Sequence, residues 1–116
     1  MKHPEAALQR TVVQWLAIQE RLGHLFFFHP ANGGYRTPAE ASAFKAMGVR
    51  PGVPDLVIIG RKFGLAFIEL KAGKKKPTAI QAEVHALLTD MGYPVVVANS
   101  LEQVEKFIQA ARKANP

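Results

Sequence analysis

Apolar residues along the chain fall into two kinds of segment, stretches with helical spacing and short continuous runs. Helical spacing covers four stretches, approximately residues 4–22, 37–47, 78–91 and 100–111. Continuous apolar runs, of the length of buried strands, occupy residues 25–28, 56–59, 65–70 and 95–97. The pattern therefore predicts the order α-β-α-β-β-α-β-α, an α/β fold with a mixed sheet of about four strands flanked by helices.

Turn and capping residues separate these segments. Thr37–Glu40 and Thr78–Gln81 both show the Thr-x-x-Glu/Gln pattern of a helix start, in which two side chains cap the backbone reciprocally. Ser100 precedes the last helix in the same way. The glycine-bounded loop Gly60–Gly64 joins two apolar strands and predicts a β-hairpin.

Composition narrows the class of protein. With 116 residues the chain is expected to form one domain, residues 1–116. It has no cysteine, which excludes disulfides, Cys-ligated metals and thiol catalysis. No apolar run is long enough to span a bilayer, and the first residues do not form a signal peptide, so we expect a cytoplasmic protein without a membrane partner. The formal net charge of +6 favours a polyanionic partner.

Three charged residues gather at the open end of the predicted hairpin. Side chains alternate across a strand, so Glu69 and Lys71 project from one face and Leu70 from the other. A hairpin that turns symmetrically about Lys62 places Asp55 opposite Glu69, with Cβ atoms about 5 Å apart. Two carboxylates at that distance repel each other unless a cation or a shared proton lies between them.

A divalent metal ion is one solution to this repulsion. Mg²⁺ is held by one or two carboxylates together with water and phosphate oxygens, and Asp55, Glu69 and the backbone carbonyl of Leu70 could supply its protein ligands. Lys71 could then orient or deprotonate an attacking water and stabilise negative charge on a phosphate. The competing interpretation is a solvated Glu69–Lys71 ion pair, with Asp55 as a turn residue after Pro54. The spacing alone leaves both interpretations open.

The surrounding motifs resemble a known nuclease family. Gly48–Leu56, then Ile68–Lys71, then Gln81 follow one another as in the VRR-NUC family (virus-type replication-repair nucleases), a branch of the PD-(D/E)xK phosphodiesterases, in its standalone form. Asn32–Gly34 and Gly92–Tyr93 fit the same pattern, which covers nearly the whole chain in order. The resemblance implies a restriction-endonuclease-like fold and hydrolysis of DNA phosphodiesters with Mg²⁺, for which Mn²⁺ can substitute.

The resemblance also implies a biological setting. Standalone relatives are similar in fold to Holliday-junction resolvases, so we expect a homodimer that cuts branched DNA, with a role in DNA repair and an origin in a phage or prophage. A flap or single-strand-end nuclease is the first alternative. A non-catalytic DNA-binding module on a nuclease fold is the second.

Three further residues gain a role from the resemblance, and each has a simpler explanation. Glu5, in the first turn of a helix, complements the helix dipole, whereas the family implies a third acidic metal ligand, direct or through water. Gln81 completes the cap of Thr78, whereas the family places it beside Lys71; one side chain is not expected to fill both roles. Asn32 is typical of a turn, but the family implies contact with substrate.

Basic residues near this centre are candidates for contact with DNA. Lys74, Lys75 and Lys76 follow Lys71 closely and would border a bound DNA backbone, and Arg36 and Arg50 are weaker candidates. His29, at a strand end, is expected to be structural and not a base. Phe63, at the hairpin tip, is an apolar residue that could contribute to a dimer surface, although a tolerant loop explains it equally.

Overall fold

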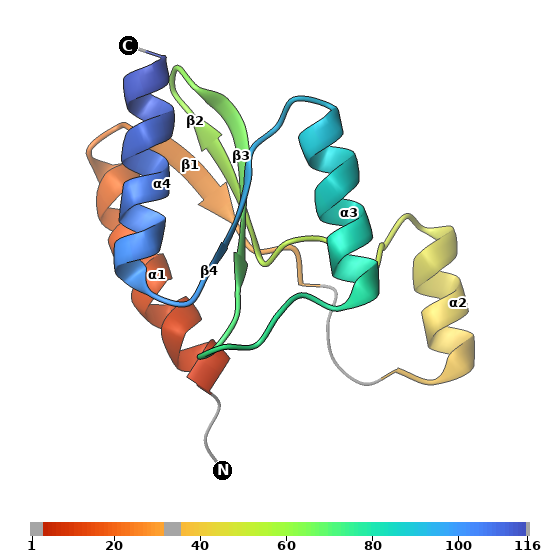
Figure 1. Ribbon diagram of the computed structural model, residues 1–116. Coiled ribbons are helices and arrows are strands. Elements are labelled where there is room, and N and C mark those ends of the chain that lie inside the picture. Colours follow the sequence, from red (N-terminus) through yellow and green to blue (C-terminus); the bar gives the residue numbers. More distant parts are fainter. Residues whose placement is uncertain (1–3, 32–35, 116) are drawn as a thin grey trace.

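The computed structural model describes residues 4–31 and 36–115 (Figure 1). Within these residues, four helices and four strands follow in the predicted order. The helices are α1 (Pro4–Arg21), α2 (Pro38–Ala46), α3 (Ala79–Asp90) and α4 (Leu101–Ala114). The strands are β1 (Leu25–Phe28), β2 (Leu56–Gly60), β3 (Gly64–Leu70) and β4 (Val95–Ala98).

The strands form one mixed sheet in the order β1-β2-β3-β4. β1, β2 and β3 are antiparallel neighbours, and β4 runs parallel to β3. The β2–β3 hairpin pairs Gly60 with Gly64 and Leu56 with Ile68, so it is centred on Lys62. This register confirms the symmetric hairpin predicted from the sequence.

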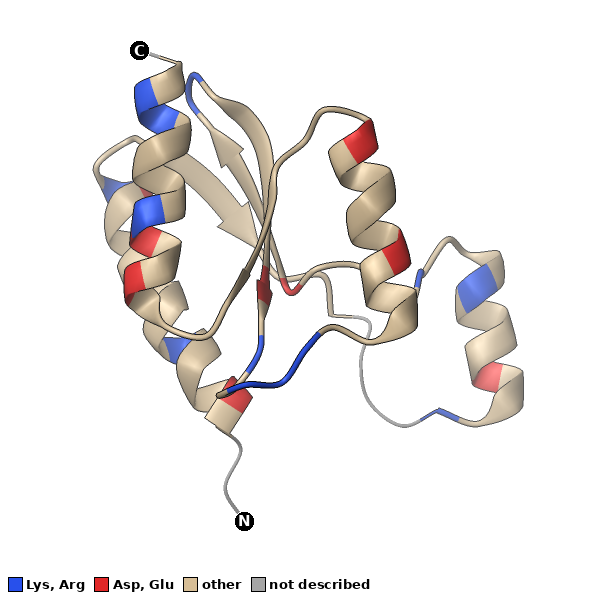
Figure 2. Ribbon diagram, in the orientation of Figure 1, with Lys and Arg blue, Asp and Glu red and all other residues tan. Residues whose placement is uncertain are grey.

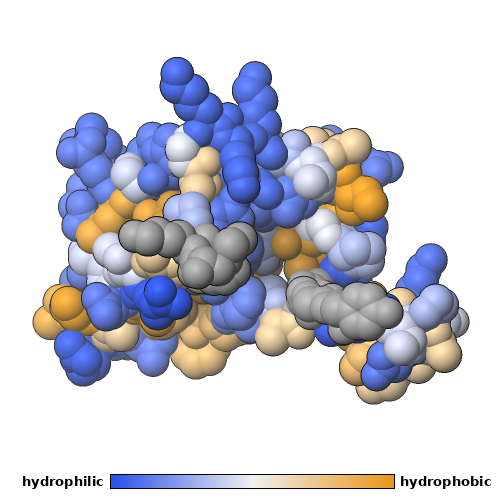
Figure 3. Space-filling view, turned by 90° about the horizontal axis from the view of Figure 1, so that it is seen from below, coloured by the Kyte–Doolittle hydropathy of each residue, from blue (hydrophilic) through white to orange (hydrophobic). Residues whose placement is uncertain are grey.

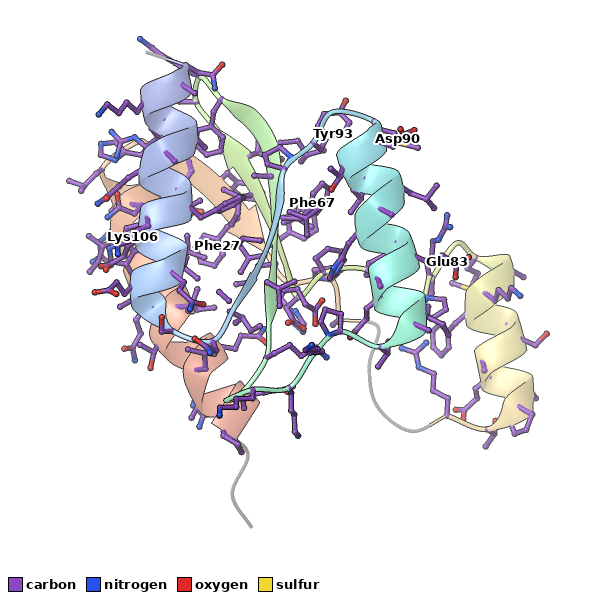
Figure 4. All side chains as sticks on the ribbon, in the orientation of Figure 1. Phe27, Phe67, Glu83, Asp90, Tyr93 and Lys106 are labelled. Atoms are coloured by element: carbon purple, nitrogen blue, oxygen red, sulfur yellow. The ribbon has the colours of Figure 1, made fainter. Side chains whose placement is uncertain are left out.

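Helices cover the two faces of the sheet unequally. α1 and α4 pack together on one face, and α3 covers part of the other, with α2 standing apart beyond α3 (Figure 1). Figure 4 shows Phe27 and Phe67 on opposite sides of the sheet, Phe27 towards α4 and Phe67 towards α3. The main core lies on the α1–α4 side, where Leu16 and Ile108 from the helices meet Ile58 and Ile68 from the strands, all fully buried.

The predicted helix starts are present. Thr37 and Thr78 each accept a hydrogen bond from the backbone N–H three residues ahead, and Glu40 and Gln81 cap them in return. Ser100 accepts from the backbone N–H of Gln103 in the same way. Among the described residues, no helix combines the length and hydrophobicity needed to cross a membrane.

Two strands expected to be buried are only partly so. Phe26 and Phe28 of β1 have 53% and 44% of their surface exposed, and Val97 of β4 has 42%. Both strands lie at the edges of the sheet, and each of these side chains points away from the α1–α4 layer. A continuous apolar run therefore predicted the strands correctly but not their burial.

The hairpin tip also differs from expectation. Phe63 is half-buried and packs against the main core, and its ring lies where a Cβ at Gly60 would otherwise be. The glycine at position 60 thus provides space for this ring. Phe63 therefore folds back towards the core, and its contribution to a dimer surface stays a prediction.

Candidate active site

Asp55 lies immediately before β2, where the hairpin opens. Continuing the register beyond the Leu56–Ile68 pair brings Asp55 opposite Glu69, as the sequence predicted. The Asp55 carboxylate does more than face its partner, because its Oδ2 atom accepts a hydrogen bond from the backbone N–H of Leu70 at 2.7 Å. The side chain of Asp55 therefore extends the β2–β3 hydrogen bonding by one position.

The backbone carbonyl of Leu70 faces the same side as this hydrogen bond. Lys71 directs its own backbone N–H to β4, where it donates to Ala98 at 3.0 Å, so the N–H and C=O of Leu70 point the opposite way, towards β2. The residue opposite Leu70 in the continued register is Pro54, which has no N–H to donate. The Leu70 carbonyl therefore points towards Asp55, and Pro54 cannot donate a hydrogen bond to it.

Glu69 and Lys71 lie on the opposite face of β3 from the main core, beneath α3. Only 2% of the surface of Glu69 and 9% of that of Lys71 is exposed. The Lys71 ammonium lies 3.7 Å from Glu69 Oε2. The interpretation of these two residues as a solvated ion pair is therefore wrong, since both side chains are buried.

Gln81, in the first turn of α3, uses both ends of its amide. Its Oε1 accepts from the backbone N–H of Thr78 at 2.8 Å, and its Nε2 donates to Glu69 Oε2 at 3.3 Å. The expectation that one side chain could not hold the cap and the site together was wrong, because the amide has separate donor and acceptor atoms.

His85 belongs to the same cluster and was missed from the sequence. It follows Gln81 by four residues on α3, so both side chains share one face of the helix. Its Nε2 atom lies 3.5 Å from Glu69 Oε1. Neither atom makes a hydrogen bond with the described part of the chain, although both are buried. The helical spacing of Gln81 and His85 was the signal that could have identified it.

The electrostatics of the cluster disfavour charge on Glu69. Burial, and then the negative charge of Asp55, raise the pKa of Glu69 to about 7, against an opposing effect of Lys71. Burial, and then the positive charge of Lys71, lower the pKa of His85. An additional positive charge between Asp55 and Glu69 would therefore stabilise the ionised form of Glu69.

Glu5 reaches the end of β3 from α1. Its Oε1 atom accepts from the backbone N–H of Ala72 at 3.4 Å. Across residues 4–31 and 36–115, no three His, Cys, Asp or Glu side chains are grouped so that they could hold a metal ion. The structure thus brings Glu5 near the strand end but not into a ligand set with Asp55 and Glu69.

The basic residues expected to contact DNA lie outside this cluster of side chains. Lys74, Lys75 and Lys76 are exposed, and Figure 2 shows their basic segment running from the end of β3 towards α3. The same end of the molecule carries a band of hydrophilic side chains between hydrophobic areas (Figure 3). Arg36 stacks its guanidinium over the ring of Phe44 at 4.0 Å, which ties it to α2.

Other loop residues have local roles. His29 Nδ1 is hydrogen-bonded to the backbone carbonyl of Asp55, which fits the structural role expected for it. Arg50 is exposed beside the apolar groove between α3 and the sheet. Asn32 lies outside the described residues.

Comparisons with known proteins identify similar structures. No family model and no curated protein matches the chain. One solved structure, described as "VRR_NUC domain protein", is 30% identical with a TM-score of 0.69, and the match covers 97% of this chain and 91% of that one. Another, described as "VRR_NUC domain", is 26% identical with a TM-score of 0.64, over 93% of this chain and 97% of that one.

Proposed function

The chain belongs to the VRR_NUC family and has its nuclease fold, and from this premise we propose that it is a Mg²⁺-dependent DNA endonuclease. The observation that carries the proposal is the convergence of Asp55, Glu69 and Lys71 at the open end of one hairpin, with the Asp55 carboxylate on the Leu70 backbone N–H and the Lys71 ammonium 3.7 Å from Glu69. A fold-level likeness alone would not support a reaction, because one fold can host many functions.

The residues of this centre fit a divalent cation. Asp55, Glu69 and the Leu70 carbonyl are oxygen donors, the kind that Mg²⁺ prefers, and two carboxylates leave room for water and phosphate oxygens. The raised pKa of Glu69 and its buried Oε1 atom without a hydrogen bond support a cation here, since a positive charge would stabilise the ionised carboxylate. When bound, Mg²⁺ supplies positive charge at the scissile phosphate and lowers the pKa of water; Mn²⁺ can substitute.

The side chains of Lys71, Gln81 and Glu5 have separate roles in the proposed reaction. The Lys71 ammonium donates a hydrogen bond to a non-bridging phosphate oxygen or to the attacking water, which stabilises charge that develops in the transition state. Gln81 holds Glu69 Oε2, so that the carboxylate keeps one orientation throughout the reaction. Glu5 fixes the backbone after Lys71 through Ala72, and we propose that it reaches a metal ion only through water.

DNA is the proposed substrate, held by its backbone. The exposed segment Lys74–Lys76 follows Lys71 directly, so its ammonium groups can contact phosphates next to the one that is cut. Such contacts carry no sequence information and make binding weaken steeply with added salt.

The proposed active unit is a homodimer that acts on branched DNA, because one chain carries one such centre and two are needed to cut two strands. An apolar surface on the α3 side of the sheet supports this pairing. Phe26 and Phe28 of β1 and Ile59 of β2 are 53%, 44% and 45% exposed, and Phe26 is the register partner of Ile59. In sedimentation experiments, Phe26→Lys should be a monomer. The control is Met47→Lys, at a 77% exposed position on the α2 side, which should remain a dimer.

Cleavage assays on defined substrates test the proposal. The purified chain is mixed with four-way junction, flap, single-stranded and linear duplex DNA in Mg²⁺, Mn²⁺ or EDTA. We expect cutting of the junction with either metal and none in EDTA. A preference for flaps or single-stranded ends would replace the junction assignment by the alternative nuclease class. Binding of DNA without cutting under any divalent metal would favour the non-catalytic module.

A further inference from the structure

A second basic feature lies at the opposite end of the sheet from Glu69. The hairpin tip, the turn after α1 and the last turn of α4 enclose a cavity of about 410 Å³. Basic side chains dominate its lining, namely His24, Arg61, Lys62, Arg112 and Lys113. In Figure 2 this basic cluster is at the end of the molecule where the C-terminus lies, away from the Lys74–Lys76 segment.

No acidic side chain of the described residues neutralises the charges of this cavity. Among residues 4–31 and 36–115, the side chains that line it include no Asp or Glu. Within residues 4–31 and 36–115, ion pairs join Lys71 and His85 to Glu69 and Lys106 to Glu102, and no cation of the cavity takes part in one. Four cations of fixed charge in one hollow, in a chain of net charge +6, therefore repel one another unless an anion binds between them.

Helix electrostatics account for part of this cluster only. Arg112 and Lys113 occupy the last turn of α4, where positive side chains complement the helix dipole. Arg61 and Lys62 come from the hairpin instead, so the α4 dipole does not explain why they lie against the same cavity.

The hairpin tip is held firmly in place. Arg61 donates through its backbone N–H to the His24 carbonyl at 3.0 Å and through Nε to the Gly23 carbonyl at 2.6 Å. Phe63 packs over Gly60 beneath it. The basic side chains thus project from a fixed wall, which lowers the entropy lost when a ligand binds.

We propose that this cavity is a second binding site for DNA backbone phosphates. The inference rests on the proposed function in taking DNA as the polyanion. Seven residue steps separate Gly64 from Lys71, about 23 Å along an extended strand or about seven base pairs of duplex. The cavity therefore holds phosphates remote from the cut, either farther along the same duplex or on another arm of a branched substrate.

Binding without cleavage isolates this site. The full chain is titrated in EDTA against fluorescent linear duplex and four-way junction DNA over a range of salt concentrations, with anisotropy as the readout. The test variant is Lys62→Gln/Lys113→Gln, at two exposed positions of the cavity. The matched control is Arg10→Gln/Lys106→Gln, which removes the same charge from exposed positions on α1 and α4 outside the cavity.

We expect the cavity variant to bind junction DNA about tenfold more weakly than the control, with a salt slope smaller by about two. An equal loss on linear duplex assigns the site to the same duplex, and a loss confined to the junction assigns it to a second arm. Equal binding by the two variants on both DNAs would overturn the inference. Wild-type protein that binds DNA through the cavity without ever cutting it would contradict the proposed function and leave this inference standing.

Discussion

The Asp55 carboxylate accepts a hydrogen bond from the backbone N–H of Leu70 at 2.7 Å. One candidate metal ligand, Asp55, therefore holds the end of β3, the strand that carries the other candidate ligand, Glu69. We therefore expect the side chain of Asp55 to contribute both to stability and to the proposed cleavage reaction. Two variants of Asp55 distinguish these contributions, one that removes only the charge and one that also removes the hydrogen bond.

Asp55→Asn keeps an oxygen that can accept from Leu70 and loses the negative charge. We expect its unfolding free energy in urea to stay near that of the wild type while cleavage falls at least about a hundredfold. Asp55→Ala leaves the buried N–H of Leu70 without its acceptor and should cost about 1–3 kcal/mol of stability. Equal stabilities of the two variants would contradict the structural role of this hydrogen bond.

The pKa of Glu69 predicts how the stability of the metal-free protein depends on pH. This pKa is about 7 in the folded protein, against an ordinary value of 4.5 in the unfolded chain, so the folded protein binds the proton more tightly. The resulting stabilisation is complete below pH 4.5 and is lost as the pH rises through 7. Over this interval wild-type protein should lose stability relative to Glu69→Gln, by an amount on the order of a few kcal/mol.

Urea unfolding of the two proteins from pH 4 to 8 in EDTA measures this difference. Added Mg²⁺ should restore wild-type stability above pH 7 and leave Glu69→Gln much less affected, since a cation that binds only the folded state stabilises it. Parallel pH profiles for the two proteins would show that Glu69 titrates normally.

Gln81→Glu separates the helix cap from the active centre. A glutamate can still accept from the Thr78 N–H, as Glu40 does for Thr37, but it cannot donate to Glu69 and adds a like charge. We expect α3 to remain folded by circular dichroism and cleavage to fall about 10–100-fold. Activity equal to that of the wild type would restrict Gln81 to capping.

His85 should position Glu69 without touching the substrate. His85→Leu removes the nitrogen that lies 3.5 Å from Glu69 Oε1, and we expect the affinity for Mg²⁺ to fall about 10–100-fold. His85→Gln places an amide donor in reach of this oxygen and should restore part of that affinity, measured by calorimetry. If both variants bind Mg²⁺ like the wild type, His85 only fills space beneath α3.

Local patterns in the sequence predicted most of the fold. The capping pairs at Thr37 and Thr78 and the hairpin centred on Lys62 depend on neighbouring residues and on one short loop, so they could be read directly. The same register brought Asp55 and Glu69 together. These features need no knowledge of how distant segments pack.

What the sequence did not predict depends on tertiary packing. The exposure of Phe26 and Phe28 follows from the edge position of β1 and from the limited area that α3 covers. The contact of His85 with Glu69 depends on which face of α3 is turned towards the sheet. The weakly amphipathic pattern of this helix does not determine that face. The burial of Lys71 likewise depends on α3 lying above it, and this burial excludes the solvated ion pair.

The most direct test of the central claim compares Lys71→Ala with Lys74→Ala on the DNA that the wild type cuts best, in Mg²⁺. Lys71 is buried, with its ammonium 3.7 Å from Glu69 Oε2, whereas Lys74 is an exposed lysine three residues later. Comparing the two variants therefore separates an effect on catalysis from general attraction to DNA. We predict that Lys71→Ala loses about a hundredfold or more in cleavage rate and that Lys74→Ala stays within about threefold of the wild type. Cleavage by Lys71→Ala at the wild-type rate would contradict the account.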